Sequence, residues 1–178
     1  MRKNLKIIIS LIILFFITIN LSNCTKDPIK IGFIGSLTSK QSQLSIDARN
    51  AIEVGIDQIN SNGGIDGRLL SLEVKDDHGD YRISLEKYNQ FKKENIELVI
   101  GPMTSNLAKA VLDAPKSEIL FISPSMSTNK LISKDDNFLR VCPLVDSQSD
   151  TFLEFIQNKN YGKISIVYDM INEEYSKH

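Results

Sequence analysis

The stretch from Leu98 to Ser127 constrains the fold most, because it reads as strand, turn, helix, strand and turn. Residues 98–100 form a short apolar run that Gly101-Pro102 stops, and residues 119–122 form a second apolar run. Between them, apolar residues at positions 107, 108, 111 and 112 have helical spacing, and Thr104 or Ser105 is placed to cap that helix. The pattern predicts two parallel strands joined by a helix.

A loop rich in serine and threonine follows each of these two strands. Residues 101–105 follow the first strand and residues 123–128 follow the second. Neighbouring parallel strands would bring both loops to one edge of the sheet, and ligands bind outside the carboxyl ends of strands in open α/β sheets. We therefore expect half of a small-molecule site at this edge.

The same alternation of strands and helices extends along the chain. Strands are predicted over residues 29–34, 69–74, 98–100, 119–122, 137–141 and 163–168, and the longer helices over residues 44–60, 81–94 and 150–160. This order predicts an α/β fold, a doubly wound parallel sheet with helices on both faces. The last helix and strand cannot bury their own apolar faces. We expect them to begin a second, incomplete lobe.

The first 24 residues have the layout of a secretory signal, with a basic start and an apolar run over residues 7–19 that is short for a membrane span. Residues 21–24, Leu-Ser-Asn-Cys, resemble a bacterial lipobox, although Asn23 replaces the usual Gly or Ala. The resemblance implies that Cys24 is lipidated and becomes the mature N-terminus. The chain would then be exported to the periplasmic or cell-surface side and anchored in the membrane as a lipoprotein. An uncleaved signal anchor is the alternative.

Composition and motifs argue against several other classes of protein. The formal net charge is −1 and no basic stripe occurs, which argues against a nucleic-acid partner. No dinucleotide-binding glycine motif, phosphate-binding loop or nucleophile elbow is present, so neither an enzyme nor a cofactor is indicated. We expect Cys142 to be a small buried hydrophobic residue.

One acidic loop, Asp76-Asp77-His78-Gly79-Asp80, could be mistaken for a metal cluster. A single histidine among carboxylates is a poor transition-metal site, and the calcium-loop pattern is missing. We expect these residues to form a turn and cap the helix over residues 81–94, and we predict no metal site.

Short motifs follow one another in order from Ile29 to Ser176. The most specific is Asn60-Ser61-Asn62-Gly63-Gly64-Ile65-Asp66-Gly67-Arg68. The others are Ile29-Lys30-Ile31-Gly32 with Leu37-Thr38, Asp76-Asp77 with Asp80, Gly101-Pro102 with Ser105, Ser123-Pro124 with Ser127, Phe138-Leu139-Arg140 with Asp146-Ser147-Gln148, and Tyr168-Asp169 with Tyr175. Together they resemble the type I periplasmic solute-binding proteins of the leucine/isoleucine/valine-binding class.

This resemblance implies two α/β lobes that close on a ligand, in a family whose members are usually about twice as long as this chain. It assigns residues 25–141 to an N-terminal ligand-binding lobe. Residues 142–178 would be the crossover between lobes and the start of an incomplete second lobe. The order and spacing of the motifs carry the resemblance, since each motif alone is weak.

The resemblance also implies which residues hold an amino-acid ligand. The hydroxyl of Ser105, the backbone of Ser125 and the hydroxyl of Ser127 would bind its α-carboxylate and α-ammonium groups. Helix capping and a simple loop position are the competing interpretations for Ser105 and Ser127. A frayed terminal residue is the alternative for Tyr175, which would otherwise cover the ligand. The candidate ligand-binding residues are Ser36, Thr104, Ser105, Ser125, Ser127 and Tyr175.

The implied function is that of an extracytoplasmic solute-binding component of an ABC importer. Its ligand would be an amino acid of the branched-chain type or a similar small polar solute, and its partner an ABC permease. Two alternatives stay open. The chain could be a truncated lipoprotein fragment that binds nothing, or a ligand-sensing receptor ectodomain.

Overall fold

The computed structural model describes residues 26–40, 42–114, 119–129, 137–159 and 161–176. These residues centre on a five-stranded sheet in the order β2-β1-β3-β4-β5, in which every neighbouring pair is parallel. The predicted parallel sheet is therefore confirmed. The strands are β1 (Ile29–Gly35), β2 (Leu70–Asp76), β3 (Leu98–Ile100), β4 (Leu120–Ser123) and β5 (Phe138–Arg140).

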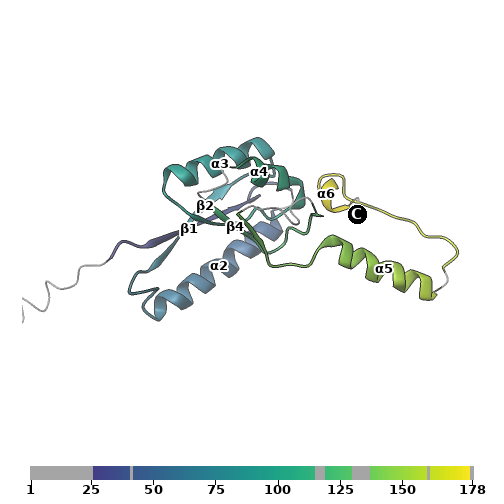
Figure 1. The fold of residues 1–178 in the computed structure, drawn as a ribbon, viewed down its shortest axis with the longest axis horizontal. Coiled ribbons are helices and arrows are strands. Elements are labelled where there is room, and N and C mark those ends of the chain that lie inside the picture. Colours follow the sequence, from purple (N-terminus) through teal and green to yellow (C-terminus); the bar gives the residue numbers. More distant parts are fainter. Residues whose placement is uncertain (1–25, 41, 115–118, 130–136, 160, 177–178) are drawn as a thin grey trace, which may run out of the picture.

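Helices cover both faces of this sheet (Figure 1). Helix α2 (Gln43–Ser61) lies on one face, and α3 (Tyr81–Lys93) and α4 (Ala108–Asp113) lie on the other, with the 3-10 turn η1 (Ser105–Leu107) leading into α4. The doubly wound arrangement follows from the chain order, because each parallel strand must be joined to the next by a crossover that packs on the sheet.

The core lies between the sheet and α3. Val99 and Phe121 come from the middle strands and meet Tyr88 and Phe91 of α3, all of them fully or almost fully buried. The rings of Tyr88 and Phe121 pack edge to face with centroids 4.8 Å apart, a favourable aromatic geometry. On the opposite face, α2 buries Ile56, whereas Ile52 is partly exposed and Ile59 is exposed.

The most specific sequence motif, residues 60–68, connects α2 to the first two strands and is not part of the predicted site. The Asn60 side chain donates to the Leu70 carbonyl (2.9 Å) and accepts from the Leu70 N–H (2.7 Å), which joins the end of α2 to the start of β2. Gly64 has φ +75°, a conformation that glycine adopts without strain. Arg68 Nε donates to the Asp27 carbonyl (2.8 Å) just before β1. The motif therefore sets where the first two strands begin.

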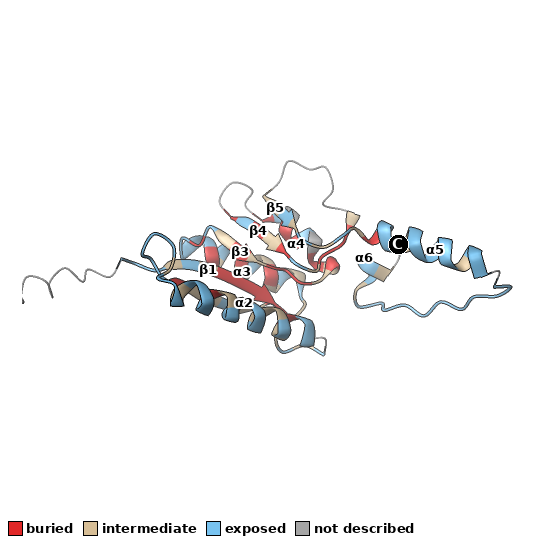
Figure 2. Cartoon of the chain, turned by 90° about the horizontal axis from the view of Figure 1, so that it is seen from below, coloured by how far each residue is buried: buried red, intermediate tan, exposed pale blue. Residues whose placement is uncertain are grey.

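The C-terminal part of the chain departs from prediction. Helix α5 (Val145–Lys159) begins earlier than the expected residue 150, and α6 (Glu173–Ser176) is a single short turn. Both views show α5 apart from the sheet (Figures 1 and 2).

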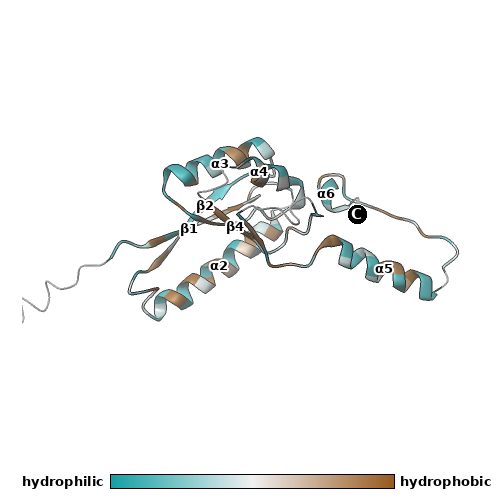
Figure 3. Ribbon diagram, viewed as in Figure 1, coloured by the Kyte–Doolittle hydropathy of each residue, from teal (hydrophilic) through white to brown (hydrophobic). Residues whose placement is uncertain are grey.

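The predicted strand over residues 163–168 is wrong, because these residues form no β-ladder. A strand needs hydrogen bonds to a neighbour, and none of the described strands lies beside this segment. Ile166 and Val167 are consequently 81% and 98% exposed, in a segment that Figure 3 shows as largely hydrophobic.

The predicted signal peptide and Cys24 lie outside the described residues. In the described ranges, no helix has both the length and the apolar character that a membrane span requires. Cys142 is partly exposed rather than buried, and its thiol lies 3.3 Å from the Met126 carbonyl oxygen.

Candidate functional site

The carboxyl ends of β1, β3 and β4 carry the predicted site loops. These three strands are adjacent and parallel, with Phe33 opposite Ile100 and Ile100 opposite Ile122. The loops that begin at Ser36, Gly101 and Pro124 therefore leave the sheet at one edge, which we call the crevice edge. The predicted convergence of the two hydroxyl-rich loops on this edge is present in the structure.

The first crevice loop is held by the acidic loop after β2. Ser36 is buried, and its hydroxyl donates to Asp77 Oδ1 at 2.8 Å. Thr38 Oγ1 donates to Asp76 Oδ2 (2.6 Å), and Leu37 N donates to Asp76 Oδ1 (2.9 Å). The hydroxyl of Ser36 is therefore used inside the protein, although sequence reasoning placed it among the possible ligand contacts.

The pKa values of the two neighbouring aspartates of the acidic loop are shifted in opposite directions. Burial raises the pKa of Asp77, and the hydrogen bonds from Gly79 and Ser36 only partly offset that rise. Burial also acts on Asp76, but hydrogen bonds from Thr38 and from backbone amides outweigh it and lower the pKa of Asp76. The difference arises because Asp77 is fully buried, whereas Asp76 is only partly buried and accepts hydrogen bonds from Thr38 and from the backbone amides of Leu37 and His78.

The predicted capping role of this loop is confirmed at Asp80. Its carboxylate accepts from the backbone N–H groups of Arg82 (2.7 Å) and Ile83 (3.1 Å) at the start of α3. Within the described residues, no group of three His, Cys, Asp or Glu side chains is arranged to hold a metal ion.

The loop after β3 turns sharply at Gly101 and Pro102, whose peptide bond is cis. Ser105 lies inside the turn η1 and is 2% exposed. The prediction that Thr104 or Ser105 caps the following helix is wrong. The residue before α4 is Leu107, without a side-chain cap, because the 3-10 turn runs directly into the helix. Ser105 Oγ forms no hydrogen bond with another described residue, and the residue is almost fully buried.

The loop after β4 is fastened to the loop after β3. Ser123 Oγ donates to the Pro102 carbonyl (2.7 Å), and Ser125 Oγ donates to the Met103 carbonyl (2.6 Å). Ser127 is 4% exposed, and its carbonyl accepts from Val145 N (3.1 Å) at the start of α5. The side chain of Ser125 is thus committed to the protein, which leaves its backbone for the ligand role that the family resemblance implies.

Sequence reasoning gave no role to two further residues of these loops. Ser123 also accepts from the N–H of Met126 (3.0 Å), so one hydroxyl organises both loops. Arg140, at the end of β5, donates from Nη2 to the Thr128 carbonyl (2.7 Å). The signal that could have identified both residues is the pairing of the two predicted strands, because Ser123 lies opposite Arg140 in the neighbouring strands β4 and β5.

A cleft of about 730 Å³ lies between the crevice edge and residues 161–176, which we call the C-terminal segment. This volume is typical of small-ligand sites. Thr104 and Tyr175 line it, whereas Ser105 and Ser127 adjoin it through their neighbours Thr104 and Val145. Its lining residues are Leu44, Thr104, Val145, Gln148, Ser149, Phe152, Ile166, Val167, Tyr168, Asp169, Asn172, Tyr175 and Ser176.

Hydrogen bonds hold the C-terminal segment across this cleft. Tyr175 Oη donates to Gln148 Oε1 (3.0 Å), and Asn106 N donates to Asn172 Oδ1 (3.2 Å). Tyr175 is 42% exposed and lies in α6, so it is placed at the cleft rather than frayed away from it. Gln148 and Asn172 are cleft residues to which sequence reasoning gave no ligand role.

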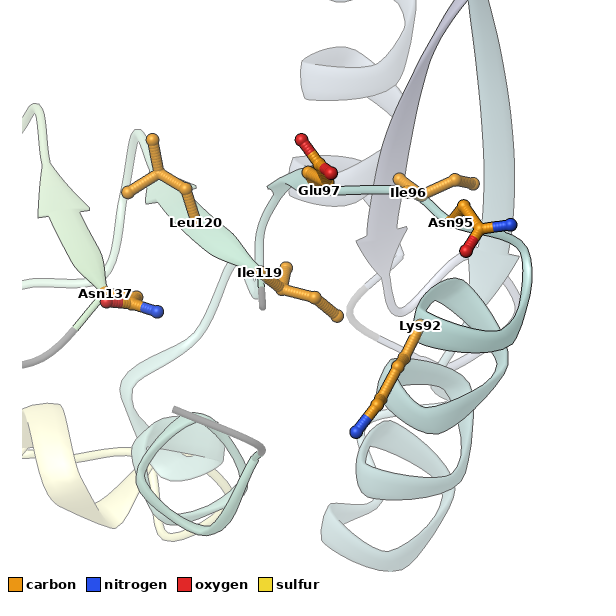
Figure 4. A pocket seen from close by; sticks show the side chains of 7 residues that line it. All are labelled: Lys92, Asn95, Ile96, Glu97, Ile119, Leu120 and Asn137. Carbon is orange, nitrogen blue, oxygen red and sulfur yellow. The ribbon is translucent and has the colours of Figure 1, made fainter. Parts of the chain in front are cut away.

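A second pocket, of about 560 Å³, lies at the opposite edge of the sheet (Figure 4). Its lining comes from the end of α3 and the amino-terminal ends of β3 to β5. These residues are Lys92, Asn95, Ile96, Glu97, Ile119, Leu120 and Asn137. Because function in open α/β sheets concentrates at the carboxyl ends of strands, we take the 730 Å³ cleft as the candidate site.

A doubly wound parallel sheet with a cleft at the carboxyl ends of its strands defines a class of α/β ligand-binding domain. The periplasmic binding protein family matches residues 28–173, and the chain belongs to this family.

Curated relatives agree with that assignment. The Leu/Ile/Val-binding protein BraC3 of Rhizobium johnstonii is 29% identical over 144 residues, covering 79% of this chain and 39% of that protein. The leucine-specific-binding protein of Salmonella typhimurium is 27% identical over 173 residues, covering 95% of this chain and 46% of that protein. The chain therefore spans less than half the length of these relatives.

Solved structures share the fold. The substrate-binding protein LivJ of Streptococcus pneumoniae, in complex with isoleucine, superposes with a TM-score of 0.69 at 25% identity, covering 74% of this chain and 38% of that chain. An extracellular ligand-binding receptor from Verminephrobacter eiseniae gives a TM-score of 0.72 at 19% identity, covering 83% of this chain and 43% of that chain.

Proposed function

We propose that this chain supplies the ligand-binding lobe of an extracytoplasmic solute-binding protein that serves an ABC importer. Its ligand is an amino acid of the branched-chain type or a similar small polar solute, and it catalyses no reaction. The observation that carries the proposal is the meeting of the β3 and β4 loops at the crevice edge, beside a cleft that Tyr175 reaches from the other side. The names of the relatives BraC3 and LivJ support the choice of ligand class.

In this proposal, Ser105 and Ser127 bind the charged groups common to all α-amino acids. A hydroxyl can donate to a carboxylate and accept from an ammonium, so one short side chain serves either group. Backbone N–H groups near Ser125 add donors for the carboxylate. The apolar cleft residues Leu44, Val145 and Phe152 suit an aliphatic ligand side chain.

Ligand capture proceeds by closure of two lobes. The N-terminal lobe would bind the solute first, and the C-terminal segment would cover it, since only the closed arrangement contacts the ligand from both sides. The predicted lipid on Cys24 would hold the protein beside its permease.

A receptor role is the second candidate. The chemotactic signal transduction system substrate-binding protein BasB of Halobacterium salinarum is 24% identical over 144 residues. Co-purification from membranes with a permease, rather than with a signalling partner, distinguishes transport from sensing.

Calorimetric titration of the purified chain with leucine, isoleucine and valine tests the proposed function. Ser105→Ala should weaken binding about 10- to 100-fold, because it removes a hydrogen bond to a charged group worth about 1.5–3 kcal/mol. Ser61→Ala is the matched control, since Ser61 lies at the end of α2, where its hydroxyl donates to the Asp57 carbonyl. Absence of heat with every amino acid would favour the non-binding fragment. Equal affinity of Ser105→Ala and the unaltered chain would remove Ser105 from the site.

A further inference from the structure

Three polar side chains meet where the first crevice loop contacts the acidic loop. Thr38 Oγ1 lies 2.6 Å from Asp76 Oδ2 and also 2.6 Å from His78 Nδ1. His78 Nδ1 lies 3.3 Å from the same oxygen of Asp76. Both contacts of Thr38 are at hydrogen-bond distance, so one hydroxyl joins the two loops. We call these residues the Thr38–Asp76–His78 cluster.

The proton of the Thr38 hydroxyl has one acceptable position in this cluster. A threonine hydroxyl has one proton and two lone pairs, whereas an ionised carboxylate only accepts. Asp76 is ionised at neutral pH, because its hydrogen bonds lower its pKa below the ordinary aspartate value. Thr38 therefore donates its proton to Asp76 Oδ2, and towards His78 the hydroxyl can only accept.

The donor in the second contact must then be the ring nitrogen Nδ1 of His78. A neutral imidazole carries one proton, on either Nδ1 or Nε2. With the proton on Nε2, the lone pair of Nδ1 would face the Thr38 oxygen at 2.6 Å and the Asp76 carboxylate at 3.3 Å, and both contacts would be repulsive. With the proton on Nδ1, both are attractive. The imidazolium form also carries this proton, so the arrangement suits either charge state.

We propose that His78 keeps a proton on Nδ1 and is a positioning residue that holds the first crevice loop against the acidic loop. The hydrogen bonds run from His78 Nδ1 to the Thr38 hydroxyl and from that hydroxyl to Asp76 Oδ2. The other oxygen, Asp76 Oδ1, accepts from the backbone N–H groups of Leu37 (2.9 Å) and His78 (2.8 Å). Each oxygen of this carboxylate therefore contacts both loops.

The cluster bears on the ligand cleft through Leu44, and this consequence rests on the proposed function. Leu44 lies in the first turn of α2, six residues after Thr38, and lines the 730 Å³ cleft. Between them, Ser42 N donates to the Ser39 carbonyl (3.2 Å), which connects the loop to the start of the helix. Holding Thr38 in place restricts where this apolar cleft residue can lie.

Nitrogen-15 NMR of the His78 ring tests the proton assignment without any ligand. The chain has two histidines, so His178→Gln leaves His78 as the source of every imidazole signal. We expect Nδ1 to keep the chemical shift of a protonated nitrogen from about pH 5 to pH 8, where histidine titrates, while the shift of Nε2 changes. A Nδ1 shift typical of an unprotonated nitrogen in the neutral ring would overturn the proposal.

Two variants of His78 test its positioning role. His78 has φ +52°, a conformation that asparagine and glycine adopt more readily than other residues. His78→Asn keeps a side-chain N–H donor, whereas His78→Gly does not. Amide hydrogen exchange of Leu37, which donates to Asp76, should become about 2- to 10-fold faster in His78→Gly and change by less than about twofold in His78→Asn. Equal exchange rates in the two variants would overturn the role.

Thr38→Val tests the other half of the same chain of hydrogen bonds. It should speed the exchange of Leu37 about as much as His78→Gly does, and combining the two changes should add little, because each breaks the same connection. Thr151→Val is the matched control, since Thr151 Oγ1 donates to the Ser147 carbonyl within α5 (2.9 Å). Fully additive effects of Thr38→Val and His78→Gly would contradict a single connected cluster.

Titration with leucine, isoleucine and valine separates this inference from the proposed function. If the unaltered chain binds, His78→Gly should bind about 2- to 10-fold more weakly, and His78→Asn should stay within about twofold of the unaltered chain. Equal binding by all three would overturn the effect on the cleft. If the unaltered chain binds none of the three amino acids, the proposed function fails, whereas the NMR and exchange measurements still decide whether His78 holds the loop.

Discussion

Replacing Gly101 by alanine should destabilise the lobe strongly, because this residue turns the chain at the end of β3. Gly101 has φ +120°, outside the range of ordinary L-residues, and a Cβ here would collide with the Ile34 carbonyl and lie 2.9 Å from Ile34 Cγ2. Backbone strain of this kind costs about 1–3 kcal/mol, and relieving the overlap in a packed core costs about as much again. We expect a total loss of about 4 kcal/mol.

That loss is a large part of the roughly 5–15 kcal/mol by which domains are stable. Urea unfolding followed by circular dichroism measures it as a lower midpoint. Gly55→Ala is the matched control, because Gly55 lies in α2 and a Cβ there meets nothing within 4 Å. It should raise stability by about 0.5–1 kcal/mol. If Gly101→Ala lost less than about 1 kcal/mol, the end of β3 would be free to move, and the proposed fixed geometry of the crevice edge would fail.

Three further substitutions test the loops that build the site. Asp80→Ala should cost about 0.5–2 kcal/mol in urea unfolding, because α3 loses its cap; a loss within error would contradict that role. Asn60→Leu should cost about 1–3 kcal/mol by leaving both polar groups of Leu70 unpaired, and an unchanged midpoint would show that water replaces the tie. Asp77→Asn should gain stability relative to the unaltered chain as pH rises above about 4. The pKa of Asp77 is raised in the folded protein, so this residue contributes its stability fully at pH values below its unfolded pKa of about 3.9. The unaltered chain loses that contribution as pH rises through the folded pKa, whereas the asparagine variant does not. Asp76→Asn should show the opposite trend, because its folded pKa is lowered, and parallel urea-midpoint profiles for the two variants would refute the assignment.

The sheet was predictable because its evidence is local and repeated. Apolar runs such as residues 98–100 and 119–122 are separated by a helical stretch, and this alternation predicts that the two strands pair in parallel. In the structure, β3 and β4 pair in that way. The same reasoning failed over residues 163–168. Alternation gives a segment the capacity to form a strand, but a partner decides whether it does.

The candidate site was predictable only as a place in the fold. Topology brings Ser36, Ser105 and Ser127 to one edge. Which hydroxyls stay free depends on partners far along the chain: Ser36 is bound to Asp77, and Ser125 to the Met103 carbonyl. Spacing in the sequence does not encode such pairings. The contact of His78 with Thr38 was equally hidden, since it joins two loops 40 residues apart.

The hydrogen bonds from Ser123 and Ser125 to the backbone of the β3 loop have a consequence for ligand capture. They join the two loops to each other in the protein without ligand. The entropy of ordering those loops is then lost during folding and not during association, which is how preorganised receptors gain affinity. If the proposed ligand binds here, we expect the conformational change to fall on the crossover and on the C-terminal segment rather than on these two joined loops.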